Sequence, residues 1–110
     1  MVLRFVTATT VAATAFCVSA GEMNSVPGAL WDHPRSGEIV AELPAMRQAV
    51  IAYLGRPGTR LIIHHAAGQE ALLQAEELRA WLVALAVSAE RIDLKSDLTR
   101  GATLKIEVMP

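Results

Sequence analysis

The first 20 residues of the chain differ in kind from the rest, and they limit how much of the chain can fold. A short charged start with Arg4 precedes an uncharged run from Phe5 to Val18 and the small residues Val18-Ser19-Ala20. This order is typical of a secretory signal peptide that is cleaved after Ala20. The expected mature chain has 90 residues (110 minus 20), which suits one compact domain and is too short for two.

A signal peptide predicts a periplasmic or secreted protein. The alternative is an uncleaved membrane anchor, but the uncharged run is shorter than the roughly 20 apolar residues of a spanning helix, and threonines interrupt it. Lipid attachment at Cys17 is not expected, because the bulky Phe16 precedes it where a small residue is needed. We therefore expect no membrane span after cleavage of residues 1–20.

Cleavage also changes the chemistry that the domain can use. It removes Cys17, the only cysteine, so no thiol remains to form a disulfide, ligate a metal or attack a substrate. Loss of Arg4 leaves 9 basic side chains (10 minus 1) against 11 acidic ones, without a basic cluster. Because binding to phosphates needs clustered Lys and Arg, this balance disfavours nucleic acid as a partner.

Residues 21–35 carry Asn, Ser, Gly and Pro without a sustained apolar period, which predicts an extended leader before a domain at 36–110. Trp31 is the exception in this leader. We expect its ring to pack on the edge of the domain, and the alternative is an exposed contact for a partner.

Two segments have the apolar spacing of amphipathic helices, Glu42–Leu54 and Gln69–Ala86. Pro44 suits the first turn of the first helix, and a Gly-Arg-Pro-Gly turn follows its end. The apolar stripes that should face the core are Leu43, Met46, Val50 and Leu54 in the first helix, and Leu72, Ala75, Leu78, Leu82 and Leu85 in the second.

Arg60–His65 is a short, mostly apolar run that predicts a central strand covered on both faces. Ile92–Lys95 and Leu104–Val108 alternate polar and apolar residues as half-buried strands do, with a polar loop at 96–101 between them. A weak leading strand or loop is expected around Gly37–Ala41. This order predicts an α/β (α+β) two-layer sandwich, (β)-α-β-α-β-β, with two helices packed on one face of a mixed sheet.

The order and spacing of these segments resemble a shortened member of the OmpA-like family, the periplasmic domain that binds peptidoglycan. The similarity runs from about Ser36 to Val108. It rests on four pieces of sequence in the same order as in the family. The first two are a helix that ends at Leu54 before a Pro-Gly turn and the strand Leu61-Ile62-Ile63-His64. The other two are the end of a second helix with the segment after it, Leu82 to Ile92, and the closing strand Leu104-Lys105-Ile106-Glu107-Val108.

The resemblance implies a ligand site made by an aspartate after the second strand and an arginine early in the second helix. Such a pair suits the carboxylate and ammonium of a diaminopimelate end group. Here 64–68 contains no aspartate, and Gln74 stands where the arginine should be. Arg79 could stand in the place of the family's arginine only if the alignment is shifted along the helix, which leaves the rest of the helix about one turn shorter than in the family. If the pocket persists, we expect His65, Gln74 and Arg79 to meet a carboxylate or a polar peptide end.

His64 and His65 lie side by side at the end of the predicted strand. Adjacent strand residues point to opposite faces, so these two rings are not expected to meet one metal ion, and His33 is a distant third histidine. We predict no metal and no cofactor. A ligand- or metal-binding module that uses His64 and His65 stays open as the alternative function.

No Ser, His and Asp set has the context of a catalytic nucleophile, and Glu70, Glu76 and Glu77 diverge around their helix. We therefore expect a non-enzymatic accessory protein of the cell envelope. The missing aspartate and arginine favour contact with an envelope protein partner, and peptidoglycan is the other partner that the resemblance implies.

Overall fold

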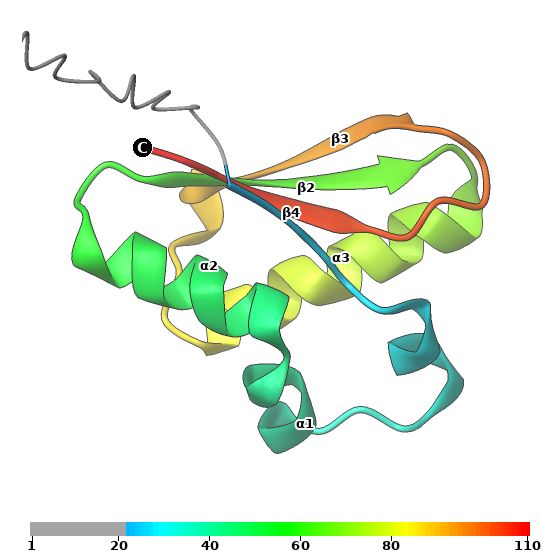
Figure 1. Ribbon diagram of the computed structural model, residues 1–110, viewed down its shortest axis with the longest axis horizontal. Coiled ribbons are helices and arrows are strands. Elements are labelled where there is room, and N and C mark those ends of the chain that lie inside the picture. Colours follow the sequence, from blue (N-terminus) through cyan, green and yellow to red (C-terminus); the bar gives the residue numbers. More distant parts are fainter. Residues whose placement is uncertain (1–21) are drawn as a thin grey trace, which may run out of the picture.

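The computed structural model describes residues 22–110; the predicted signal peptide and its cleavage site after Ala20 lie outside these residues. Helices and strands form two layers, with α2 and α3 below one face of a four-stranded sheet (Figure 1). The elements are β1 (Glu22–Ser25), η1 (Gly28–Asp32), α1 (Gly37–Glu42), α2 (Pro44–Gly55), β2 (Arg60–Ala66), α3 (Gln69–Ala84), η2 (Ala89–Arg91), β3 (Ile92–Leu98) and β4 (Lys105–Met109). This architecture confirms the predicted α+β class.

The sheet is mixed, with the strand order β1-β4-β2-β3. Strand β2 runs parallel to β3 and antiparallel to β4, and β1 pairs with β4 in antiparallel fashion. The parallel pair is joined through α3, because strands that run in the same direction need a long crossover. Within residues 22–110, no helix is long and apolar enough to cross a membrane.

The start of the domain differs from the prediction. Residues 37–41, expected to form a weak strand or loop, belong to helix α1, which begins where the Ser36 hydroxyl accepts a hydrogen bond from the backbone N–H of Ile39 at 3.2 Å. The leading strand is β1, inside the segment expected to be an extended leader. Pairing with β4 uses backbone groups, so it needs no apolar period in β1.

The buried side of α2 is rotated from the predicted stripe. Met46 is buried as expected, but Ala45 and Ala49 complete the buried face, and Leu54 is 63% exposed. Leu54 follows Ala45 by nine residues, which places it half a turn away around the helix. Small alanine side chains allow α2 to lie close to its neighbours in the core. In α3, Ala75, Leu78 and Leu82 are buried as predicted, whereas Leu72 is exposed.

Strand β2 is the most buried element, because every residue from Leu61 to Ala66 is excluded from water. Leu61 and Ile63 pack in the core with the apolar residues of α2 and α3. The prediction of a central strand covered on both faces is confirmed by this burial, and the helices lie on one face of the sheet (Figure 1). Polar side chains of neighbouring strands cover Ile62 and His64 on the other face.

Truncation of Ile63 to alanine tests the central place of β2. Ile63 is 0% exposed, so Ile63→Ala should lower the free energy of unfolding by about 2–5 kcal/mol through lost contacts and a residual cavity. Ile51 on α2 is 65% exposed, and Ile51→Ala should change it by less than about 0.5 kcal/mol. Urea unfolding followed by circular dichroism measures both; equal effects would contradict the assigned core.

Candidate functional site

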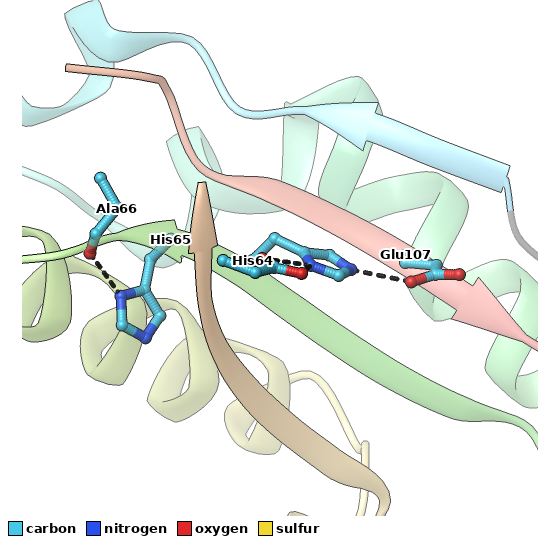
Figure 2. A network of polar contacts seen from close by, with 5 residues as sticks. His64, His65, Ala66 and Glu107 are labelled. Atoms are coloured by element: carbon cyan, nitrogen blue, oxygen red, sulfur yellow. Dashed lines mark hydrogen bonds and ion pairs between the residues drawn. The ribbon is translucent and has the colours of Figure 1, made fainter. Parts of the chain in front are cut away.

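The two adjacent histidines of β2 point to different sides of the sheet. Figure 2 shows His65 directed away from the row formed by His64 and Glu107. The Nδ1 atom of His65 lies 2.8 Å from the carbonyl oxygen of Ala66, so Nδ1 carries the proton and donates to that oxygen. Both rings are buried. The structure therefore places the two side chains on opposite faces, as the alternation of strand residues predicts.

His64 lies between two carboxylates on the face of the sheet opposite the helices. Its Nδ1 atom is 2.8 Å and 2.9 Å from the two carboxylate oxygens of Asp97, and its Nε2 atom is 2.8 Å from Glu107 Oε1. Both ring nitrogens can donate to ionised carboxylates only when the ring is a cation. His64 is 5% exposed, so the two carboxylates enclose a buried ring and provide an acceptor at each of its nitrogens.

The network fastens three strands to one another. Asp97 belongs to β3, His64 to β2 and Glu107 to β4, and the hydrogen bond from His64 is the main cause that lowers the pKa of the Asp97 carboxyl. Closer to the other end of β2, the Arg60 guanidinium donates to both carboxylate oxygens of Asp93 on β3. Two sets of contacts, His64 with Asp97 and Glu107 and Arg60 with Asp93, thus link the strands across the open face, which suits a structural role.

A wide groove lies where β2 ends and α3 begins. Its walls come from η1, the first turns of α3 and the turn between β3 and β4. Charged side chains of both signs line it, including Asp32, Glu70 and Arg100. Gln74 also lines this groove. We call it the α3 groove, after the helix whose N-terminal end forms its wall.

One side of the α3 groove is a cluster of four side chains that joins the leader to α3. The Arg35 guanidinium binds the Glu77 carboxylate in bidentate fashion and lies 5.0 Å from the centre of the Trp31 ring. Trp81 Nε1 donates to the same carboxylate at 3.1 Å. These hydrogen bonds, that of Arg35 first, lower the pKa of Glu77. Trp31 packs against the core at the domain edge, as predicted.

The predicted ligand residues lie in two places. His65 and Arg79 line a second groove, between α3 and β3, together with Glu76. Gln74 lies on the α3 groove instead, because five residues along a helix turn a side chain through about 140°. The structure thus brings His65 and Arg79 together and separates Gln74 from them, so one ligand end cannot be met by all three in the way we expected.

Several polar residues of these sites gave no clear signal in the sequence. Asp97 lies in the segment expected to be a loop, yet β3 continues through Leu98. Glu77 was expected to be solvated, and it pairs with Arg35 across 42 residues of chain. For Glu107, the alternating pattern of the last strand identified the polar face but not the histidine beneath it.

The carboxylate of Asp97 gives a prediction for the dependence of stability on pH. Because its folded-state pKa is lowered, Asp97 stabilises the fold at pH values above its unfolded-state pKa, and this contribution is lost as the pH falls through the folded-state value. Asp97→Asn should therefore destabilise the protein at about pH 6, and its difference from the wild type should shrink as the pH falls below about 4, the usual unfolded-state pKa of aspartate. Urea unfolding at several pH values measures the difference.

Glu42→Gln serves as the control for this series, because Glu42 is exposed and forms no ion pair among residues 22–110. A constant gap between wild type and Asp97→Asn across the pH range would contradict the assigned role of the His64–Asp97 contact.

The two grooves offer donors and acceptors rather than a converging set of metal ligands. In the part of the chain that the structure describes, no three His, Cys, Asp or Glu side chains are placed to hold a metal ion. The chain matches no family model, no curated protein and no solved structure. Its function is therefore inferred from the geometry of the described residues.

Proposed function

We propose that this chain is an exported, non-enzymatic accessory protein of the cell envelope that holds the charged end of a cell-wall peptide or of a protein partner in the α3 groove. The observation that carries this proposal is the lining of the groove by charges of both signs. Arg100 has no ion-pair partner among residues 22–110, and the carboxylate of Glu70 lines the same groove. A zwitterionic end group needs such a donor and such an acceptor.

The start of α3 adds donors for a carboxylate. The first backbone N–H groups of a helix have no partner inside the helix, and Gly68, at the N-cap, supplies no side-chain cap. Gly68 has φ of +114°, a backbone conformation that residues with a Cβ rarely adopt. This end of the 16-residue helix lines the groove and favours negative charge.

The resemblance to the OmpA-like family supports the same location by a different set of residues. That family is expected to bind its ligand after the second strand and early in the second helix, which is where the α3 groove lies. Here Ala66, Ala67 and Gln74 line those positions. Arg100 and Glu70 provide the positive and negative charges from other positions in the chain.

The alternative module based on His64 and His65 has less support. The ring nitrogens of His64 are both occupied by carboxylates, and His65 faces the other side of the sheet. A ligand that used both rings would have to break the network on β2. We therefore place the ligand in the α3 groove.

Titration of the 15N-labelled protein with a diaminopimelate-containing stem peptide tests this proposal. The protein for this titration is expressed from the full sequence, including residues 1–20, and is then purified. We expect saturable shifts at Gly68, Glu70 and Arg100, because these residues line the groove. Arg100→Gln should weaken binding about tenfold or more by removing the donor for the carboxylate.

Arg56→Gln is the matched control, since Arg56 is an exposed arginine in the turn after α2, outside the groove. A second peptide with a free carboxylate but no diaminopimelate distinguishes a cell-wall peptide from the end of a protein partner. Shifts with both peptides indicate recognition of any charged peptide end, as in a protein partner. No shift with either peptide would contradict the proposed function.

Export is tested on the same expressed protein. If the first 20 residues are a signal peptide, the protein recovered from the periplasm should begin at Gly21, because the small residue Ala20 precedes the expected cleavage site. Intact-mass measurement gives the start of the chain. Substitution Ala20→Arg should block processing, and an unchanged full-length mass for the wild type would contradict cleavage.

A further inference from the structure

Strand β3 has one free edge. The strand order β1-β4-β2-β3 leaves it at the end of the sheet within residues 22–110, and it is seven residues long. On the face opposite the helices it carries Asp93, Lys95 and Asp97, which are exposed and alternate in sign. Asp93 and Asp97 also contact Arg60 and His64 of their own chain, whereas Lys95 has no ion pair among residues 22–110. An edge strand presents unpaired backbone N–H and C=O groups, which can pair with another strand.

The side of α3 next to this edge is also without a partner. Leu72, Glu76, Arg79 and Val83 recur at spacings of four, three and four, so they form one row along the helix. Leu72 is 40% exposed and Val83 is 44% exposed. The groove between α3 and β3 places Leu72, Glu76 and Arg79 beside Leu94.

Arg79 lacks a good acceptor within residues 22–110. Its contact with Glu76 is 3.8 Å long, and its Nε atom is buried without a hydrogen-bond partner among residues 22–110. A guanidinium is best satisfied by a carboxylate that accepts two hydrogen bonds. The helix row thus combines two exposed apolar side chains with a cation that is short of an acceptor.

We propose that this surface, formed by β3 and the row on α3, binds a second copy of the chain. Two β3 strands would pair in antiparallel fashion about Leu94 and join two four-stranded sheets into one of eight strands. In this register Asp93 faces Lys95 of the second copy, and Lys95 faces its Asp93. Arg91 faces Asp97 of the second copy in the same way, so each of these contacts joins opposite charges.

The same two-fold axis brings the α3 helices together in matching order. Leu72 meets Val83 of the second copy, and Glu76 meets Arg79 of the second copy. Both pairs are centred on the same point of the helix, between residues 77 and 78, so one two-fold axis relates them. Helix α3 contacts both β2 and β3. It packs mainly against β2. With strands about 4.8 Å apart, a helix between the midpoint of these strands and β2 would lie about 10–14 Å from its symmetry mate, so side chains of the two facing rows would meet across the axis.

The charge pattern also selects against neighbouring registers. If the strands paired about Lys95, two lysines would face each other, and Asp93 would face Asp97. Like charges directly opposite one another destabilise a strand pair. The commonest closed assembly of identical chains is a two-fold dimer, in which one surface pairs with itself. The alternation on β3 and the row on α3 both meet that requirement.

Sedimentation of the purified protein, expressed with its own N-terminal segment, measures this association. We expect a concentration-dependent dimer. Lys95→Glu should weaken it about tenfold or more, because two like-charge contacts replace two attractive ones. Arg47→Glu is the control, since Arg47 is an exposed cation on α2. Leu72→Asp should also weaken the dimer, and Ile51→Asp on α2 should not.

A charge exchange identifies the register. Lys95→Glu and Asp93→Lys chains should each dimerise poorly alone, because each pairs like charges with itself. Their mixture should form a heterodimer, in which Asp93 meets Lys95 and both substituted residues meet opposite charges. Circular dichroism confirms that each variant is folded.

Three outcomes would overturn the proposal. The first is a wild-type protein that stays monomeric up to about 1 mM, the weakest affinity that a specific contact of this kind should show. The second is a dimer that neither Lys95→Glu nor Leu72→Asp weakens. The third is failure of the two folded charge variants to associate while the wild type does.

Discussion

The structure depends on a central strand that has hydrogen-bonded neighbours on both sides and no side chain in water from Leu61 to Ala66. On the helix side, apolar residues satisfy this burial. On the other side the strand carries His64, and a polar ring at such a position must find partners because unpaired buried polar groups are costly. Asp97 and Glu107 meet this requirement from the two neighbouring strands. The positions of β3 and β4 are thereby linked through one imidazole ring.

Both proposed contact surfaces lie away from this network, at the end and at the edge of the sheet. The α3 groove begins where β2 ends, and its Glu70 and Arg100 form no ion pair among residues 22–110. The pair of Arg35 and Glu77 fixes the leader as one wall of that groove.

Local patterns were sufficient for the long elements and insufficient for the short ones. The spacing of apolar residues located α2, α3 and the three later strands, because each buries a regular face. Helix α1 is six residues long and begins with the capping hydroxyl of Ser36, so it has little periodicity to detect. Strand β1 is held by its pairing with β4, a contact with residues at least 80 positions away. Helix α2 turns its alanine side toward the core because small side chains allow a close approach. The spacing of apolar residues alone does not show which side of the helix will do so.

The sequence by itself determined the α+β class, the order of the main elements and the placing of His64 and His65 on opposite faces, since these follow from helix and strand periods. Only the tertiary structure decided which polar residues meet. His64 lies 33 residues from Asp97 and 43 residues from Glu107 along the chain. Glu70, Arg100 and Gln74 share a groove, whereas Arg79 turns away to the other side of α3. The physical reason is that a side chain's neighbours are set by strand order and helix rotation, and these are fixed by packing of the whole core.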